Sequence, residues 1–208
     1  APSPSARHHA RARVRPVGSL GMPLPHLPGF VSLEPLARPD LLAPPVAQLL
    51  ARHPELTGRL AVVEIDPALA DTAALGTAYG LDPGASGNCV VISGSRTGQE
   101  RIAACVVGAD TRADVNNVAK RRLDVRGASF HPMDRAVAES GMEYGGITPI
   151  GLPADWRLFI DDRLLERRVV ILGSGVRRGK LLIEGAALAD LPGAEIVADL
   201  GRPIAAAL

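Results

Sequence analysis

Residues 140–153 read Ser-Gly-Met-Glu-Tyr-Gly-Gly-Ile-Thr-Pro-Ile-Gly-Leu-Pro, and this stretch says more about the fold and the function than any other part of the chain. Glycine adopts backbone angles that other residues avoid and lets another molecule approach the main chain closely. Proline fixes φ and removes a hydrogen-bond donor, so the loop is stiff as well as bare. Such a loop suits a site in which peptide groups recognise a ligand. A tight connection between two strands is the alternative that composition leaves open. The three glycines and two prolines that crowd its second half are Gly145, Gly146, Pro149, Gly151 and Pro153.

The composition is that of one globular domain. The chain has 208 residues, of which 47% are hydrophobic, enough for one sizeable core. No apolar run approaches the roughly 20 residues that a membrane span requires, so we expect no membrane partner. The net charge of +1 argues against a strongly basic nucleic-acid-binding surface. We therefore expect no DNA partner, and any RNA contact must come from local patches.

The two cysteines, Cys89 and Cys105, are too few for a disulfide framework. A hairpin could place them face to face, but we expect reduced core thiols in a cytoplasmic protein. The sequence has no nucleophile elbow, no P-loop, no dinucleotide fingerprint and no zinc-ligand spacing. We therefore expect neither a cofactor nor a metal.

The chain divides at about residue 43. Residues 1–43 are rich in proline, serine and arginine, include a His8-His9 pair and have no sustained apolar period. We expect them to form a flexible or loosely packed extension, and residues 44–208 to form the domain. Helices and strands alternate in this domain, which predicts an α/β or α+β fold. Helices are expected over residues 44–53, 72–79, 114–122, 134–140 and 185–191, and strands over 60–65, 89–93, 101–107, 158–160, 169–172 and 180–184.

Two further motifs are weak when taken singly. Gly173-Ser174-Gly175, followed by Arg177-Arg178-Gly179, is similar to an anion-binding turn, in which bare amides lie beside guanidinium groups. A hairpin turn with solvated arginines is the alternative. Asp161-Asp162 follows a predicted strand and could form either a turn or a site carboxylate. The polar face of residues 116–122 is explained equally well by solvent exposure.

The order of these segments is more specific than any one of them. From about Leu69 to Leu188 the chain resembles the YbaK/EbsC family, the aminoacyl-tRNA editing domain that is also inserted in bacterial prolyl-tRNA synthetases. Family members read Thr-Gly and then Gly-Gly-x-x-Pro-x-Gly, where this chain has Ser140-Gly141 and then residues 145–151. Residues 113–120 resemble the family helix that ends in Ala-Lys. Asp161-Asp162 and residues 173–179 follow at the expected spacing.

The resemblance implies a single compact domain with a mixed, strongly curved β-sheet and flanking helices. It also implies a freestanding deacylase that hydrolyses the ester of a mischarged tRNA without a metal or a covalent nucleophile. The expected partners are the 3′ end of an aminoacyl-tRNA and, as a further candidate, an aminoacyl-tRNA synthetase. The alternatives are an inactive module that binds tRNA or a synthetase, and a small-molecule binding protein of the same fold. The implied catalytic residues are Gly145 and Gly146, and the implied substrate-binding residues are Asn88, Thr148, Pro149, Gly151, Asp161, Gly173, Ser174, Gly175 and Arg178.

One position departs from the family pattern. Several members place a lysine at the start of the strand where this chain has Asn88. Lysine offers a point charge to a phosphate, whereas asparagine offers only neutral hydrogen bonds. The substitution puts in doubt any carry-over of amino-acid specificity, although we still expect Asn88 to line the pocket.

Overall fold

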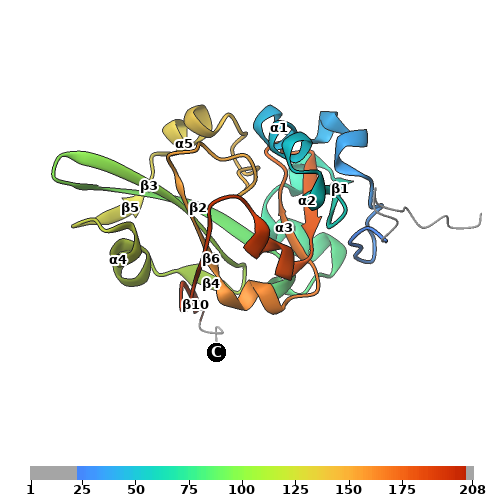
Figure 1. Ribbon diagram of the computed structural model, residues 1–208. Helices are drawn as coiled ribbons and strands as arrows, with labels where there is room; N and C mark the ends of the chain where they lie inside the picture. The colour runs from blue at the N-terminus through green and yellow to red at the C-terminus, as the bar shows by residue number, and fades with distance from the viewer. Residues whose placement is uncertain (1–22, 205–208) are drawn as a thin grey trace, which may run out of the picture.

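The computed structural model describes residues 23–204, whose strands form three sheets (Figure 1). A five-stranded sheet has the order β5-β2-β3-β6-β9, a three-stranded sheet has the order β1-β8-β7, and β10 pairs with β4. The strands are β1 Leu60–Glu64, β2 Gly87–Arg96, β3 Gln99–Gly108, β4 Thr111–Ala113, β5 Ala128–Phe130, β6 Arg157–Asp161, β7 Val170–Gly173, β8 Gly179–Ile183, β9 Ala194–Val197 and β10 Gly201–Pro203.

The long hairpin of β2 and β3 is the centre of the larger sheet (Figure 1). Its turn is made by Thr97 and Gly98, both with positive φ, which is the turn geometry that matches the twist of a two-residue hairpin. On its other edge β3 runs parallel to β6, so the sheet is mixed, as predicted. Cys89 and Cys105 are free, and burial raises the pKa of the Cys105 thiol to about 12.

Local signals placed the main helices correctly. Asp71 accepts hydrogen bonds from the amides of Ala73 and Ala74, and so caps the helix that follows. Gly80 ends that helix in the left-handed conformation, as Gly141 ends α5. The helices are α1 Pro44–Arg52, α2 Pro54–Thr57, α3 Thr72–Tyr79, α4 Lys120–Leu123 and α5 Met133–Ser140, and there are 3₁₀ turns that include Gly185–Asp190.

The predicted helix over residues 114–122 has an irregular first half. Val115–Ala119 forms a π-helical turn, and α4 continues from it. The amide of Ala119 donates to the carbonyl of Asp114, five residues earlier, while the Asp114 carboxylate accepts from the amide of Asn117. π-helical turns are rare in proteins, and those that occur are often found at functional sites.

The N-terminal boundary differs from the prediction. Residues 23–43, expected to be loosely packed, are part of the core: the Phe30 ring stacks on Tyr79, and Leu41 is fully buried. Leu33 also forms a bridge to Val62 in β1. This packing could not be predicted from the sequence, because the apolar residues in this segment are isolated between prolines and show neither a helical nor a strand periodicity. Residues 1–22, including the histidine pair, lie outside the described residues.

The fold class is α+β in a single domain. The strands divide among three sheets, whereas the sequence predicted one strongly curved sheet. The largest apolar cluster joins the two main sheets, since it contains Val62 of β1, Val106 of β3 and Leu181 of β8. None of the helices within residues 23–204 combines the length and the apolar character that crossing a membrane requires.

Candidate functional site

The glycine-proline loop packs main chain to main chain against the turn between β7 and β8. The amide of Glu143 donates to the carbonyl of Gly175 over 2.8 Å, and the amide of Gly175 donates to the carbonyl of Gly146 over 2.8 Å. A Cβ on Gly146 would lie 2.9 Å from the carbonyl carbon of Gly175, closer than side chains are found. The two glycine-rich segments that the resemblance assigns to the site therefore lie against each other.

The free peptide groups of this loop are not quite those predicted. The amide of Gly146 donates to the carbonyl of Glu143 over 2.9 Å, so it is already occupied. Within residues 23–204, the amides of Gly145 and Ile147 donate to no acceptor. Gly145 is exposed and has a φ of +78°, a conformation that favours glycine. The loop thus presents two unpaired donors on either side of Gly146.

The second half of the loop anchors it. Thr148 is fully buried, and its amide lies 3.5 Å from the sulfur of Met142. Pro149 is buried as well. Gly151 has a φ of +84° and lies against the main chain of Pro45 at the start of α1. These predicted substrate-binding residues therefore support the loop from behind.

The two arginines of the β7–β8 turn point in different directions. The Arg177 guanidinium donates to the carbonyls of Tyr144, at 3.3 Å, and of Pro67, at 3.0 Å. It thereby links the glycine-proline loop to the segment before α3. The predicted residue, Arg178, instead forms an ion pair with Glu64 at 2.7 Å. Arg177 is therefore the arginine at the loop.

Ser174 contributes little polarity to the turn. Its side chain is fully buried, and its hydroxyl lies 3.4 Å from the carbonyl of Val176. The three predicted residues of this turn, Gly173, Ser174 and Gly175, thus form a bare surface on which the glycine-proline loop lies.

Asn88 lines a separate cavity of about 560 Å³ at the N-terminal end of α3. Its Oδ1 accepts a hydrogen bond from the hydroxyl of Thr72 over 2.9 Å. The cavity is lined by polar side chains and small residues, so a polar ligand of modest size fits its chemistry. No residue of the glycine-proline loop lines it. The lining residues include Asp71, Thr72, Thr77, Asp82, Ser86 and Asn88.

Lys180 lies between these two parts and was missed in the sequence. Its ammonium is buried and donates to the carbonyl of Ala70 over 2.7 Å, one residue before the cap of α3. Burial lowers the pKa of Lys180. Lys180 pairs with Gly173 across β7 and β8, so its side chain leaves the same face of the sheet on which Gly146 packs. A lysine in the otherwise apolar strand Gly179–Ile183 was the available signal, because a buried charge is costly unless a specific partner binds it.

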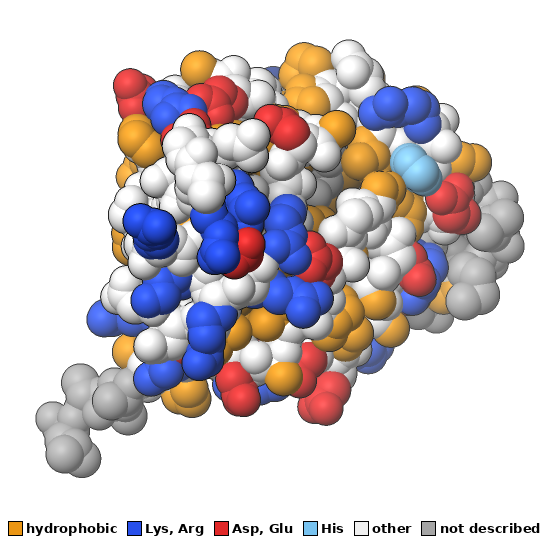
Figure 2. Space-filling model, turned by 60° about the vertical axis from the view of Figure 1, so that its left-hand side comes forward, with side chains coloured by type: hydrophobic (Ala, Val, Ile, Leu, Met, Phe, Trp, Pro, Cys, Tyr) orange, Lys and Arg blue, Asp and Glu red, His pale blue; other side chains and the backbone are white. Residues whose placement is uncertain are grey.

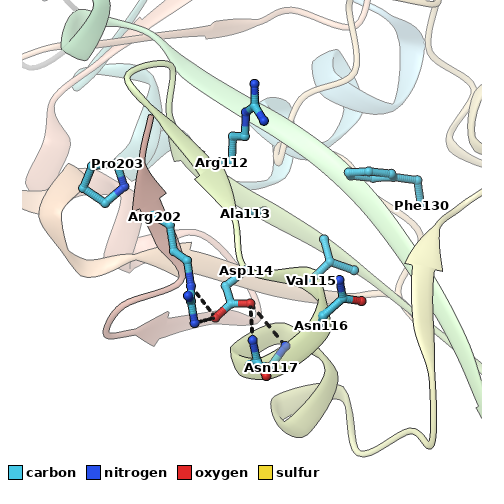
Figure 3. A pocket seen from close by; sticks show the side chains of 9 residues that line it. All are labelled: Arg112, Ala113, Asp114, Val115, Asn116, Asn117, Phe130, Arg202 and Pro203. Atoms are coloured by element: carbon cyan, nitrogen blue, oxygen red, sulfur yellow. Dashed lines mark hydrogen bonds and ion pairs between the residues drawn. The ribbon is translucent and has the colours of Figure 1, made fainter. Parts of the chain in front are cut away.

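A second, open cavity lies at the π-helical turn, far along the five-stranded sheet. It has a volume of about 330 Å³ and is lined by Arg112 of β4 and Phe130 of β5, among others (Figure 3). At its base Asp114 forms an ion pair with Arg202 at 2.6 Å. Lysine and arginine side chains (blue) are numerous on the face of the molecule that turns forward from the left of Figure 1 (Figure 2).

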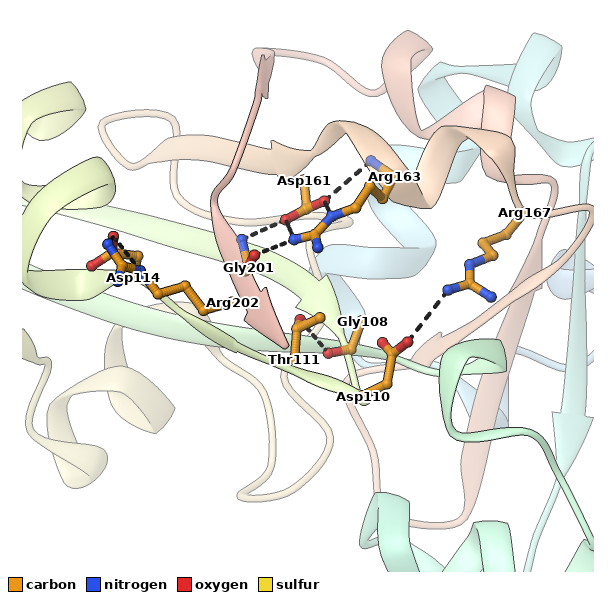
Figure 4. Close-up of polar contacts among 9 residues, drawn as sticks. All are labelled: Gly108, Asp110, Thr111, Asp114, Asp161, Arg163, Arg167, Gly201 and Arg202. Atoms are coloured by element: carbon orange, nitrogen blue, oxygen red, sulfur yellow. Dashed lines mark hydrogen bonds and ion pairs between the residues drawn. The ribbon is translucent and has the colours of Figure 1, made fainter. Parts of the chain in front are cut away.

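Asp161 belongs to neither the loop nor the Asn88 cavity (Figure 4). Its carboxylate is 1% exposed, accepts two hydrogen bonds from the Arg163 guanidinium and also accepts from the amide of Gly201. Burial raises the pKa of Asp161, but these hydrogen bonds outweigh it and hold the pKa below its usual range. The bond from Gly201 joins β6 to β10, and the bonds from Arg163 join β6 to the 3₁₀ turn Asp162–Glu166 that follows it, so the arrangement is a structural one. Within the described residues, no group of three or more metal-ligating side chains comes together.

Comparison with known proteins identifies the chain's relatives. Residues 66–191 match the family model described as the aminoacyl-tRNA editing domain. The crystal structure of hypothetical protein APE2540 superimposes with a TM-score of 0.66 at 19% identity and covers 76% of this chain and 99% of that one. A putative trans-editing enzyme for prolyl tRNA synthetase superimposes with a TM-score of 0.65 at 23% identity, covering 82% of this chain and 99% of its own. At these identities the structures show a shared fold. No match is found among curated proteins.

Proposed function

Because this chain belongs to the aminoacyl-tRNA editing domain family, we propose that it is a freestanding trans-editing deacylase. It hydrolyses the ester between a wrongly attached amino acid and the 3′ end of a tRNA. The observation that carries this proposal is the pair of unpaired amides, Gly145 and Ile147, on a loop that glycines hold against the β7–β8 turn.

The chemistry suits so bare a site. An aminoacyl ester is already activated, so positioning and polarisation supply much of the rate. In our proposal the two amides bind the ester carbonyl, whose oxygen gains negative charge as water attacks. The water oxygen then bonds to the carbonyl carbon, the carbon–oxygen bond to the ribose breaks, and a proton passes to the ribose oxygen. A neighbouring ribose hydroxyl of the substrate assists this proton transfer.

The remaining parts receive supporting roles. Arg177 fixes the loop by binding the carbonyl of Tyr144, and it lies next to the place where the ester would bind. The Asn88 cavity is large enough for part of the substrate and offers amide, hydroxyl and carboxylate groups for recognition. Since Asn88 is neutral, it discriminates by hydrogen bonds and shape.

The direct test is a deacylation screen against a panel of mischarged tRNAs. We expect the wild-type protein to hydrolyse at least one of them. Alanine keeps the backbone amide, so Gly145→Ala should act by blocking approach to the loop and displacing that amide, and should slow the reaction by about 10²–10³, as the loss of an oxyanion donor does. A Cβ on Gly145 would lie 3.0 Å from the Arg177 guanidinium and would strain a backbone with positive φ. Gly98→Ala is the matched control, because Gly98 has a φ of +79° and open space around it.

A second candidate is an inactive module that binds tRNA or a synthetase. The neutral Asn88 at the position of the family lysine favours it. This candidate predicts that the protein binds tRNA with no turnover across the whole panel. Wild-type activity in Gly145→Ala would contradict the role that the deacylase proposal gives to the loop.

A further inference from the structure

Positive charge is concentrated on one face, which we call the basic face. It consists of residues 111–130 and the charged side chains that bond to them. It contains nine cations and three carboxylates, an excess of six, although the whole chain has a net charge of only +1. The cations are Arg96, Arg101, Arg112, Lys120, Arg121, Arg122, Arg126, Arg157 and Arg202, and the carboxylates are Asp114, Asp124 and Glu195.

The carboxylates neutralise only part of this charge. Asp124 pairs with two arginines, Glu195 pairs with two more, and Asp114 pairs with Arg202. Among the described residues, no carboxylate lies within ion-pair distance of the other four cations. Three of these, Arg112, Arg121 and Arg126, are exposed. Figure 2 shows the resulting crowd of cationic side chains with few acidic ones between them.

An exposed aromatic ring lies at the edge of this face. Phe130 is 65% exposed and borders the cavity of about 330 Å³ at the π-helical turn. Arg112 projects from β4 on the same side of that cavity, and Asn116 offers an amide at its rim (Figure 3). An exposed ring among arginines and amides is the arrangement on which unstacked nucleotide bases bind.

We propose that the basic face binds the RNA backbone of the tRNA, with an unpaired base stacked on Phe130. This inference rests on the proposed function for the identity of the RNA. The cations are eight arginines and one lysine, and the planar guanidinium group matches phosphate in a bidentate manner. A partner protein with an acidic surface would bind the cations but would have no need of the exposed ring. RNA uses both features, so it is the partner that fits the basic face better.

The basic face is separate from the glycine-proline loop. It lies on the five-stranded sheet around α4, whereas the loop packs on the turn between β7 and β8 of the other sheet. No residue of the basic face lines the Asn88 cavity. Substitutions on this face should therefore change tRNA affinity while leaving the ester-binding loop intact.

The test measures the binding of uncharged tRNA to the full chain by fluorescence anisotropy at several salt concentrations. The test variant is Arg121→Glu/Arg126→Glu. The control is Arg52→Glu/Arg168→Glu, which makes the same change in charge at two exposed arginines outside the basic face. We expect the test variant to weaken binding at least tenfold at about 0.1 M salt. It should also reduce the slope of log K against log salt by about 2, one for each lost phosphate contact.

Two further measurements separate the outcomes. Phe130→Ala should weaken tRNA binding roughly 5- to 150-fold, the range for the loss of one stacked base. Because uncharged tRNA is the probe, these results do not depend on turnover, so an inactive deacylation screen would overturn the proposed function alone. If the test and control variants lose tRNA affinity equally, the proposal that the basic face binds RNA is wrong. It is also wrong if the test variant keeps its tRNA affinity and instead loses binding to a synthetase.

Discussion

The carbonyl oxygen of Gly146 occupies the space into which a side chain on Gly173 would project. A Cβ on Gly173 would collide with that oxygen and would also lie 2.8 Å from the carbonyl oxygen of Ile147. Both atoms belong to the main chain, so neither can rotate away. The absence of one side chain thus allows a strand end from the three-stranded sheet to carry the loop with the free amides.

Gly173→Ala should therefore damage the site from behind. We expect the free energy of unfolding to fall by about 1–3 kcal/mol, the usual cost of forcing a group into a packed region. The value of kcat/KM for deacylation should fall by more than the loss of folded protein explains, because the amides of Gly145 and Ile147 would be displaced. Chemical denaturation and kcat/KM on the same preparation measure the two effects. Gly193→Ala, in open space with a φ of +75°, is the control, and equal activity in both variants would contradict the packing argument.

Local chemistry made part of this fold predictable. Asp71 and Gly80 bound α3 through their own short-range preferences, and Gly98 marks the hairpin of β2 and β3. The order of motifs assigned both the glycine-proline loop and the 173–175 turn to the site, but the main-chain contact between them was not predicted. The directions of the side chains in this turn could not be predicted from the sequence, because side chains alternate between the two faces along a strand but not in a turn. Arg177 and Arg178 are neighbours, yet only Arg177 contacts the loop.

Other parts depended on tertiary contacts between residues distant in sequence. Lys180 meets the carbonyl of Ala70, 110 residues earlier, and nothing near either residue indicates that contact. For Asp161 the sequence left a turn and a site carboxylate open. The structure shows it at the start of a turn, and its other partner, Gly201, lies 40 residues later in a strand too short to predict. Net charge was misleading in the same way, because it averaged a basic face with an acidic remainder.

Asp161→Ala should destabilise the protein without disabling the site. We expect a loss of about 3 kcal/mol, because removing the carboxylate leaves Arg163 and the amide of Gly201 without their partner. The contribution of Asp161 should be complete above the unfolded pKa near 3.9 and should disappear as pH falls through its lower folded pKa. Denaturation of wild type and variant from pH 7 to pH 2 measures this. A large loss of kcat in the fraction that remains folded would return Asp161 to the site.

Asn88→Ala should weaken substrate binding. The substitution removes the acceptor for the Thr72 hydroxyl and one polar wall of the cavity. We expect KM for the edited tRNA to rise about fivefold to 30-fold, as for the loss of one or two kcal/mol of hydrogen bonding. Thr72→Val separates the two causes, since it breaks the same hydrogen bond but leaves Asn88 in place. If both variants hydrolyse the substrate like wild type, Asn88 does not contact it.

Lys180→Met should show whether the buried ammonium holds the two halves of the site together. The variant keeps the apolar stem but loses the hydrogen bond to Ala70, which precedes the cap of α3. We expect kcat/KM to fall about tenfold, because α3 carries Thr72 and with it the orientation of Asn88.

The same variant makes a pH prediction with a definite sign. Burial lowers the folded pKa of Lys180 below its unfolded value near 10.4, so between the two values the unfolded chain binds more protons. The free energy of unfolding of wild type should therefore rise with pH across that alkaline interval, relative to Lys180→Met. Urea titrations at pH 7 to 10.5 give the difference directly. A difference that stays constant with pH would mean that the folded protein holds Lys180 as readily charged as the unfolded chain does, and would remove the buried ammonium from this account of the site.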